Sequence, residues 1–569
     1  MAPVQGIDIL STLPFIVVTL FAVIVLMLEA FQRESASRSY LAWVAAVGFV
    51  ATGFSANLLL DQSPALTFSG MSYLDGFTQV MTLLFAFAGG AAALMAPGYL
   101  RAQGADRGEF YALLLLSVGG MIMMVSAANF VVFFIALEIM SIAIYALAAF
   151  TRRSKASGEA GAKYFLLGAF ASALLLYGIA LVFGATGSTN YEAIAAIFGG
   201  TPSDLLPSVS IQDGLASVAG DSLVARDATV GRALGTVGLV FIVVAFGFKI
   251  AAAPFHMWAP DVYTGAPSPA AGFMASAVKA AGIAALYRIL SVAFFEQGLR
   301  VSETGWITVV FALALISMLW GNIGAIVQTN VKRMLAYSSI AHAGYLLVGV
   351  VAVGYGAGNI QAGEGIIFYA FTYTFATLGA FGVLAWLNRK GAPVQSFADL
   401  KGVGYRYPWI GLVMSIFMLS SAGIPPLAGF MGKFFIFRSA IESATAPANA
   451  SLGGNGLLIG LVVIGVLSSL AGTYYYLRVI VAMYMERTES ELSENVAPSA
   501  RFAIAACAAL TVVVGIVPGN LMELSSKGAA EMLGRADTGY GPVVPEARYI
   551  EAGEDARHEI LQELEQAAE

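Results

Sequence analysis

Four ionisable side chains lie inside long apolar stretches of this 569-residue sequence: Glu138, Lys249, Lys279 and Lys433. A charge near the centre of a lipid bilayer costs about 2.5–3.5 kcal/mol on insertion scales. A chain keeps several such charges only where something compensates for them. The usual compensation is a function that needs titratable groups away from water, and the chemistry that these side chains share is the binding and release of a proton.

The stretch from Phe246 to Gly282 contains two of the lysines, Lys249 and Lys279, together with four prolines. Burial disfavours a charged ammonium group, whereas a nearby carboxylate favours it. A lysine such as Lys249 beside a carboxylate such as Glu138 can therefore gain and lose a proton near neutral pH. Lys279, if close to Lys249, would release its proton as one member of a coupled pair. We expect these three residues to form one proton-transfer group.

Several of the candidate residues also have a purely structural interpretation. Glu138 can be a buried hydrogen-bonding anchor, and Lys433, close to a helix break, can bond the carbonyls freed at that break. His342 is either a bridge between two halves of the protein or a packing residue. His256 and Asp261 either take up protons or stabilise a turn. A further set of side chains either lines a hydrated path or only binds helices together: Tyr337, Ser338, Ser339, Thr372 and Thr377.

The composition is that of a membrane protein. Hydrophobic residues make up 59% of the chain and charged residues 11%, whereas a soluble domain has about 25% charged residues. The single cysteine, Cys507, excludes an internal disulfide and a cysteine-ligated iron–sulfur cluster. The sequence contains no CxxC, HExxH or glycine-rich nucleotide loop, and no basic patch for nucleic acid. We therefore expect no redox cofactor and no metal site in this chain.

The apolar stretches predict an all-α, polytopic fold of about fourteen transmembrane helices, since each crossing needs about 20 residues. Two of the stretches form one continuous run of twice that length, so a tight turn must lie near residues 126–129. The predicted spans are 9–30, 40–60, 75–96, 109–127, 129–150, 161–184, 235–258, 268–293, 305–327, 331–355, 365–388, 409–438, 455–484 and 500–518.

The distribution of Lys and Arg predicts the orientation in the membrane. Most of these residues lie in or beside the odd-numbered connections between spans, and few, such as Arg226, Arg232 and Arg300, lie in the even-numbered ones. Positively charged residues favour the cytoplasmic side. We therefore expect both termini on the outer, periplasm-like side, where the long polar connection 185–234 would also lie. The first span lacks a basic region before it and is predicted to be retained rather than cleaved.

Two segments share an uncommon plan, a span interrupted by proline with a lysine nearby: Gly247–Trp258 and Ser420–Phe437. Broken spans at corresponding positions of two halves indicate inverted repeats with a transport site between them. Because each predicted unit has five spans, the second must be inserted upside down. The predicted divisions are 1–108 (three N-terminal spans), 109–293 (first repeat), 305–484 (second repeat), 500–518 (last span) and 519–569 (hydrophilic tail).

The motifs around these residues resemble those of a known family, the antiporter-like membrane subunits of respiratory complex I, the proton-translocating NADH–quinone oxidoreductase. The resemblance covers roughly residues 75–485 and rests on LEIMSIAIYAL with Glu138, FKIAAAPFHMWAPDVYTGAPSP with Lys249, MASAVKAAG with Lys279, VKRMLAYSSIAHAGYLL and GIPPLAGFMGKF. Within the family, the absence of a long lateral helix and the lysine rather than glutamate at position 433 favour one subunit type.

The resemblance implies a role for each residue. Glu138 and Lys249 would form the modulating pair of a first half-channel, and Lys279 would be the central relay site. His342 would lie on a connecting polar axis, and Lys433 would lead to the opposite face of the membrane.

The resemblance also implies the setting. The protein would lie in a bacterial inner membrane, with both termini on the periplasmic side, beside other antiporter-like subunits and small K/J/A-type subunits. FMN, iron–sulfur clusters and quinone would belong to partner subunits. The alternatives are a subunit of a multi-subunit cation/proton antiporter or of a membrane-bound hydrogenase, or a structural spacer of the membrane arm.

Overall fold

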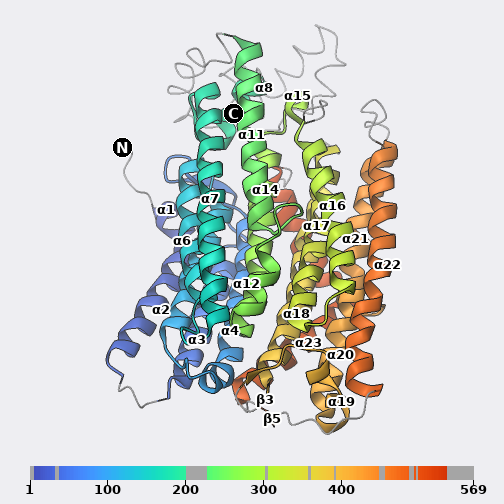
Figure 1. Cartoon of the computed structure of the whole chain (residues 1–569). Coiled ribbons are helices and arrows are strands. Elements are labelled where there is room, and N and C mark those ends of the chain that lie inside the picture. The colour runs from blue at the N-terminus through green and yellow to red at the C-terminus, as the bar shows by residue number, and fades with distance from the viewer. Residues whose placement is uncertain are drawn as a thin grey trace.

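The computed structural model of the protein describes residues 6–32, 37–199, 227–300, 305–355, 360–389, 392–446, 455–485, 493–494 and 497–534. The described chain is a bundle of long, roughly aligned helices (Figure 1). Within these residues, thirteen helices are long and apolar enough to cross a membrane. The prediction of an all-α, polytopic fold is therefore confirmed, whereas the division into two inverted repeats remains a prediction.

Twelve of the thirteen are single α-helices. They are α2 (Leu13–Ala30), α3 (Ser39–Leu58), α4 (Gly76–Ala102), α5 (Glu109–Ser126), α6 (Phe130–Ala148), α7 (Lys155–Thr186), α11 (Ala228–Lys249), α16 (Trp306–Ile326), α17 (Val331–Tyr355), α18 (Ile360–Trp386), α22 (Asn455–Met485) and α23 (Pro498–Ile516). The thirteenth runs without interruption from α13 (Ser268–Phe273) through a π-helical turn, η2 (Met274–Val278), into α14 (Lys279–Val292).

A further crossing is made by two shorter helices, α20 (Pro408–Ala422) and α21 (Ala428–Thr445). The single span predicted at 409–438 is thus interrupted at 423–427, where Gly423 has a φ of +88° and the Pro425–Pro426 peptide bond is cis. Proline removes a backbone donor and clashes with the preceding turn of a helix, which explains why the interruption lies there.

The span predicted at 235–258 is also shorter as a helix than the apolar pattern suggested. Helix α11 ends at Lys249, and irregular turns lead to the short helix α12 (Ala259–Gly265). Backbone groups released by this break find partners within the protein, as they must in lipid. The amide of Ala253 donates to Ser317 Oγ at 2.8 Å, and the indole of Trp258 donates to the carbonyl of Phe248 at 3.0 Å.

Short elements connect the long helices. They are α1 (Gly6–Ser11), α8 (Tyr191–Gly199), α15 (Gln297–Arg300), α19 (Val403–Arg406), α24 (Gly519–Met532), the 3₁₀ turn η3 (Ala398–Leu400), and the strands β1 (Ala65–Thr67), β2 (Ser72–Leu74), β3 (Leu387–Arg389), β4 (Ala392–Pro393) and β5 (Ser493–Glu494). Strands β1 and β2 pair antiparallel, and β3 pairs with both β4 and β5.

Two of these short helices lie in segments predicted to be polar connections. Helix α8 falls in the predicted loop 185–234, of which 200–226 lies outside the described residues. Helix α24 falls in the predicted hydrophilic tail 519–569, of which 535–569 lies outside them. The part of the tail that the structure describes is therefore a helix, and it packs against α4 and α18.

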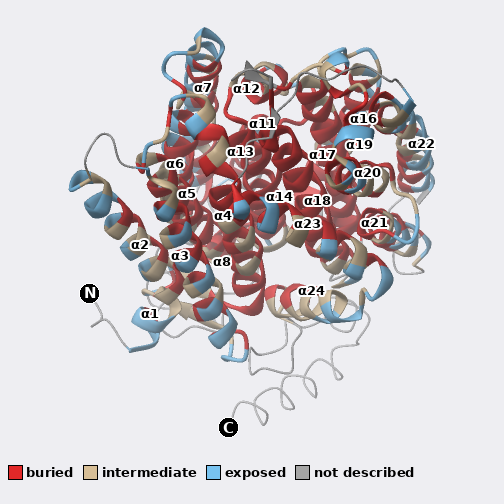
Figure 2. Cartoon of the chain, turned by 90° about the horizontal axis from the view of Figure 1, so that it is seen from below, coloured by how far each residue is buried: buried red, intermediate tan, exposed pale blue. Residues whose placement is uncertain are grey.

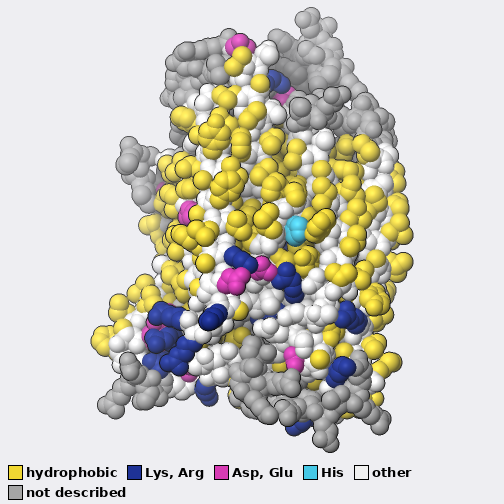
Figure 3. Space-filling view, in the orientation of Figure 1, with side chains coloured by type: hydrophobic (Ala, Val, Ile, Leu, Met, Phe, Trp, Pro, Cys, Tyr) yellow, Lys and Arg dark blue, Asp and Glu magenta, His cyan; other side chains and the backbone are white. Residues whose placement is uncertain are grey.

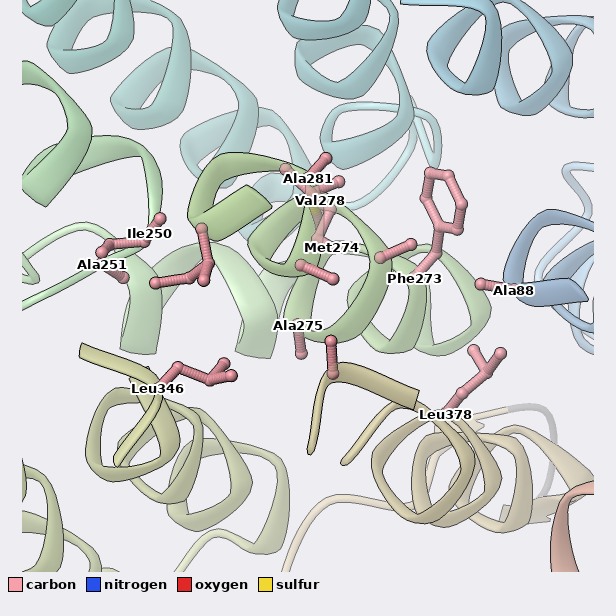
Figure 4. Packing of buried hydrophobic residues seen from close by; sticks show 14 of the residues in the cluster. Ala88, Ile250, Ala251, Phe273, Met274, Ala275, Val278, Ala281, Leu346 and Leu378 are labelled. Carbon is pink, nitrogen blue, oxygen red and sulfur yellow. The ribbon is translucent and has the colours of Figure 1, made fainter. Parts of the chain in front are cut away.

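The centre of the bundle is formed by α13–α14, α17 and α18, whereas α2, α7 and α22 lie at its rim (Figure 2). The most apolar windows of Ser268–Val292 and α18 are 100% buried, compared with 22% for α2. Figure 4 shows how small side chains make this close packing possible. There, Ala275 and Ala281 of the central helix lie among Ile250, Leu346 and Leu378. Lys279 therefore lies on one of the most buried helices of the molecule, whereas Lys249 lies on α11, whose most apolar window is 50% buried.

Charged side chains are distributed unevenly along the bundle. In the face shown in Figure 3, hydrophobic side chains cover most of the middle, and Lys and Arg gather toward the lower end. This asymmetry agrees with the prediction that one end of the bundle carries the positively charged connections.

Candidate functional site

Lys249 is the last residue of α11 and is buried against α6. Its ammonium group donates hydrogen bonds to the hydroxyls of Ser141 at 2.9 Å and Tyr145 at 3.0 Å. Glu138 lies on the same face of α6, three residues before Ser141 and seven before Tyr145, because residues at those spacings align along a helix. The sequence-predicted partners Glu138 and Lys249 therefore face each other across two neighbouring helices.

Glu138 and Lys249 do not form a direct ion pair among the described residues. The carboxylate of half-buried Glu138 accepts a hydrogen bond from Ser172 of α7 at 2.5 Å. The lysine is instead held by two neutral hydroxyls, which can rotate and can both donate and accept a hydrogen bond.

Lys279 lies at the end of the π-helical turn η2, at the first residue of α14. Single π-turns inside α-helices are frequent at functional sites, since the extra residue changes the direction of a side chain. The ammonium of Lys279 is buried and bonds both the carbonyl and the hydroxyl of Ser339 on α17. No hydrogen bond among the described residues joins Lys279 directly to the Glu138–Lys249 group.

His342 lies on α17, one turn after Ser339, and both of its ring nitrogens are hydrogen-bonded. Its Nδ1 is 2.6 Å from the hydroxyl of Tyr369 on α18, and its Nε2 is 2.9 Å from that of Tyr476 on α22. The hydroxyl of Tyr476 also bonds Ser338 on α17, beside the Ser339 that holds Lys279. Buried hydrogen bonds thus run between α17, α18 and α22 around His342, and its place on a polar axis for protons remains a prediction.

Lys433 of α21 is the fourth buried charge. Its ammonium donates to the carbonyls of Ser421 at 2.8 Å and Ala422 at 3.3 Å, and to Ser469 Oγ of α22 at 2.8 Å. These carbonyls are at the end of α20, so Lys433 caps the helix break, as the structural interpretation of this residue predicted. The ammonium also lies 5.3 Å from the ring centre of Tyr345.

Tyr345 connects the regions of Lys433 and His342. Its ring centre is 5.6 Å from that of His342, and its hydroxyl accepts a hydrogen bond from Asn322 at 2.9 Å. Asn322 in turn accepts from the hydroxyl of Tyr475, the neighbour of Tyr476. The side chains between Lys279 and Lys433 are therefore polar or aromatic, although hydrogen bonds do not join them in one unbroken line.

Asp261 and His256 lie at the first helix break, but they do not contact each other through a recorded hydrogen bond. Asp261 accepts from Lys163 of α7 at 2.8 Å and from Arg333 of α17 at 2.5 Å. Burial raises the pKa of Asp261, but the hydrogen bonds and charges of Lys163 and Arg333 outweigh this effect and leave it below its usual value. His256 packs 5.8 Å from the ring of Trp320.

The hydroxyl side chains named from the sequence are not equivalent. Ser338 and Ser339 take part in the hydrogen bonds around His342 and Lys279. Thr372 donates to the carbonyl of Tyr369 within its own helix, which is a local structural bond. Tyr337 packs 6.4 Å from the ring of His256, away from the lysines.

Sequence reasoning missed a fourth buried lysine. Lys332, counted only as a positive charge of a connection, is fully buried at the start of α17. Its ammonium donates to the carbonyls of Thr264 at 3.1 Å and Ala266 at 2.8 Å, at the end of α12. The signal that could have revealed it is the proline-rich turn at 254–269, whose free carbonyls need a donor.

A buried ion pair was also missed. Arg288 of α14 donates two hydrogen bonds to Asp75, the N-cap of α4, at 2.7 and 2.9 Å. Arg288 lies near the end of one apolar stretch and Asp75 at the start of another, so each residue alone is typical of a span terminus. Only the fold brings them together.

Among the described residues, no group of three or more His, Cys, Asp or Glu side chains is arranged to hold a metal ion.

Comparison with known proteins places this arrangement in context. The family described as NADH:quinone oxidoreductase/Mrp antiporter, TM, matches residues 127–452 of the chain. NADH-quinone oxidoreductase subunit N of Trichlorobacter lovleyi is 38% identical over 524 residues, covering 92% of this chain and 97% of that protein. The protein of the same name from Myxococcus xanthus is 38% identical over 541 residues, covering 90% and 96%.

Solved structures give the same result. A chain of respiratory complex I from Thermus thermophilus is similar with a TM-score of 0.69 and 30% identity, covering 90% of this chain and 99% of that one. A chain of the Mrp complex from Dietzia sp. has a TM-score of 0.70 at 20% identity, covering 92% and 98%, and shares the fold.

Proposed function

The chain belongs to the NADH:quinone oxidoreductase/Mrp antiporter family, in the branch of NADH-quinone oxidoreductase subunit N, and on that premise we propose that it is a proton-translocating subunit of complex I. In this proposal, NADH oxidation and quinone reduction take place in partner subunits, which hold the flavin, the iron–sulfur clusters and the quinone. This subunit moves protons through its buried lysines.

One observation carries the proposal. Lys279 is buried at a π-helical turn and is hydrogen-bonded to α17, where a buried group of hydroxyls surrounds His342. Buried polar groups at mid-membrane depth are costly and therefore mark ion and proton pathways more often than packing sites. Hydroxyl and imidazole side chains can each accept one proton and donate another, so they suit a relay.

The proposed switch is electrostatic and lies at Glu138 and Lys249. Two unit charges about 4 Å apart interact by about 4 kcal/mol at an effective dielectric of 20, equal to about a thousandfold change in proton affinity. In the described state, Lys249 is bonded to Ser141 and Tyr145. A move of about 4.5 Å along α6, the rise of three residues, would bring it level with Glu138. Forming that pair would draw in a proton, and breaking it would release one toward Lys279.

The orientation and partners of the subunit complete the proposal. The gathering of Lys and Arg toward one end of the bundle supports a cytoplasmic location for that end. The termini, α8 and α24 would then lie on the periplasmic side of a bacterial inner membrane. Two five-helix inverted repeats, 109–293 and 305–484, would supply the two half-channels. Neighbouring antiporter-like and small membrane subunits would flank the chain.

The test is the substitution Lys249→Ala in the intact complex. NADH-driven proton translocation should fall at least about tenfold, since removing a positioned proton donor typically costs about 10²-fold or more. Lys249→Arg, which keeps the charge but holds its proton, should also pump poorly although it assembles. If Lys249→Ala pumps as many protons per electron as the wild type, the relay is wrong.

A cation/proton antiporter subunit is the second candidate, because the Mrp chain shares the fold. Copurification separates the two. A complex that oxidises NADH and reduces quinone supports the first function. A complex without flavin or clusters that exchanges Na⁺ for protons supports the second.

A further inference from the structure

A second group of buried charges lies away from the lysines, where the start of α4 meets α14 and α24. Asp75 is 5% exposed and Arg288 2% exposed, and their bidentate ion pair is flanked by the rings of Tyr73 and Phe77, 4.7 and 4.9 Å from the guanidinium. Arg288 also donates to Thr78 Oγ1 at 3.1 Å. This pair fixes the end of α14, the helix that begins at Lys279, against α4.

Helix α24 adds a third charge to this group. A carboxylate oxygen of Glu531 accepts the backbone N–H of Gly76, the first residue of α4, at 2.5 Å. The free N–H groups at a helix start favour an anion. Asp75 already occupies that place, however, and is paired with Arg288. Glu531 is therefore a second carboxylate beside one that has taken the available positive charge, and like charges at such a site disfavour ionisation of one of them.

Helix α24 is closely packed against its neighbours. A side chain placed at Gly363 of α18 would put its Cβ 2.2 Å from the Tyr287 hydroxyl of α14 and 2.9 Å from Cβ of Ala529 on α24. Gly528 of α24 lies against the backbone of Phe77 on α4. Helix α24 thus packs against α4 and α18 at one end of the bundle, with Tyr287 of α14 beside it at Gly363. Lys279 lies on α14, and Tyr369, the partner of His342, lies on α18.

We propose that α24 is a lid over the outer end of the proton-transfer helices, and that Glu531 makes its closure depend on the pH at that side. The proposal rests on the proposed function, because it regulates the same proton-transfer helices. A closed lid holds α4, α14 and α18 together and keeps water from the polar groups between them. An open lid gives those groups access to the outer solution.

The sign of the dependence follows from the surroundings of Glu531. Burial raises its pKa most, and the charges of Asp75 and, to a smaller extent, Asp61 raise it further, against the hydrogen bond from Gly76 and the charge of Lys527. A docked group with a raised pKa stabilises docking below that pKa, and this contribution is lost as the pH rises through it. The lid should therefore close as the outer side becomes acidic. Closure under a large proton gradient would limit the return of protons.

Other charged groups near α24 are not the source of the proposed pH dependence of lid closure. Lys527 pairs with Asp61 at 2.7 Å, and Asp61 is 91% exposed, so this pair is screened by solvent. On α18, Glu364 interacts with Arg438 and Glu442 rather than with Glu531. Asp61 contributes least to the raised pKa of Glu531, and its substitution leaves the Asp75–Arg288 pair and the bond from Gly76 in place, so Asp61→Asn provides a matched control that alters an α24 contact.

The test uses the intact complex in inside-out membrane vesicles, whose interior is the outer side. Hydrogen exchange of residues 519–532 is measured at luminal pH values from about 8 to about 5.5 and corrected for the intrinsic pH dependence of exchange. In the wild type and in Asp61→Asn, protection of α24 should rise at least about threefold at low pH. In Glu531→Gln, which keeps a hydrogen-bond acceptor but cannot ionise, protection should be high at every pH. If Glu531→Gln shows the same pH dependence of protection as the wild type, or if the wild type shows none, the proposal that α24 is a pH-dependent lid is wrong.

Proton return gives a second, functional measurement. After NADH is exhausted, the decay of the luminal acidity should be at least about twofold faster in Glu531→Ala than in the wild type, because its lid docks poorly. Equal decay in an assembled Glu531→Ala complex would overturn the proposal. Failure of the relay would appear differently, as unchanged forward pumping in Lys249→Ala, and the exchange measurement on α24 does not depend on that result.

Discussion

The two helix breaks of this protein share a sequence plan but use their lysines differently. At the first break, Lys249 precedes the interruption and is bonded only to side-chain hydroxyls of a neighbouring helix. At the second, Lys433 follows the interruption and is bonded to two backbone carbonyls and one hydroxyl. Beyond the first break, at the end of α12, the carbonyls of Thr264 and Ala266 accept hydrogen bonds from another lysine, Lys332.

This difference separates a structural task, the capping of helix-end carbonyls, from the proposed transfer of protons. Side-chain hydroxyls can rotate and exchange a proton, whereas helix-end carbonyls are fixed acceptors that need a donor at all times. At the first break the indole of Trp258 bonds the carbonyl of Phe248, and Lys332 caps the end of α12, so among the described residues Lys249 bonds hydroxyls and no helix-end carbonyl. Lys433 must combine both tasks. We therefore expect the same substitution to harm assembly at position 433 and proton transfer alone at position 249.

The largest effect should come from Lys433→Met. It removes the donor to two buried carbonyls, at about 1–3 kcal/mol for each unsatisfied group. Both the amount of assembled complex and its NADH-driven pumping should fall, the pumping at least about tenfold. Native gel electrophoresis measures the first and dye-monitored acidification the second. Normal assembly of this variant would show that the carbonyls do not depend on Lys433, and the contrast between the two breaks would fail.

Lys332→Met should also reduce assembly, because it leaves the carbonyls of Thr264 and Ala266 without their donor. The complexes that do assemble should pump within about twofold of the wild-type rate, since capping is a structural task. A tenfold loss of pumping in fully assembled complexes would instead place Lys332 in the relay.

A smaller loss is expected when the partners of Lys249 are changed one at a time. Tyr145→Phe or Ser141→Ala removes one hydrogen bond of about 1 kcal/mol, and the pumping rate should fall about fivefold without loss of assembly. Ser469→Ala is the matched control at the second break, where two carbonyls still hold Lys433. Equal losses of pumping rate in Tyr145→Phe and Ser469→Ala would contradict the proposed difference between the two helix breaks.

The smallest effect should come from Asp261→Asn at the surface of the first break. Because the pKa of Asp261 is lowered in the folded protein, its ion pairs stabilise the fold above the unfolded pKa and this contribution is lost as the pH falls. Thermal unfolding of the variant should therefore begin slightly earlier than in the wild type at pH 7, with the difference shrinking as the pH falls below the unfolded pKa and through the lowered folded-state pKa. A difference that grows toward low pH would mean that the carboxylate is not the paired group.

The sequence predicted the all-α membrane fold, the two proline-interrupted crossings and the burial of the three lysines, whereas Glu138 is half-buried. These follow from apolar length, proline chemistry and the cost of a charge in lipid. It did not predict that Glu138 bonds Ser172 rather than Lys249, or that Lys332 is buried. Such contacts depend on the rotation of each helix about its axis, which a nearly uniform apolar pattern does not specify.

The Asp75–Arg288 pair was beyond prediction for a related reason. Its members are separated by 213 residues and lie at span ends, where single charges are ordinary. The helix in the tail was missed because α24 is short and polar in composition. Its stability comes from packing on α4 and α18, which no local pattern reveals.

The most direct test of the central claim, that buried side chains carry protons through this subunit, is the acidification of proteoliposomes containing the complex with Lys279→Met. This substitution keeps the length and packing of the side chain and removes only the protonatable group. The account predicts an assembled complex whose NADH-driven acidification is at least about tenfold slower than that of the wild type. Acidification at the wild-type rate by fully assembled Lys279→Met complexes would contradict it.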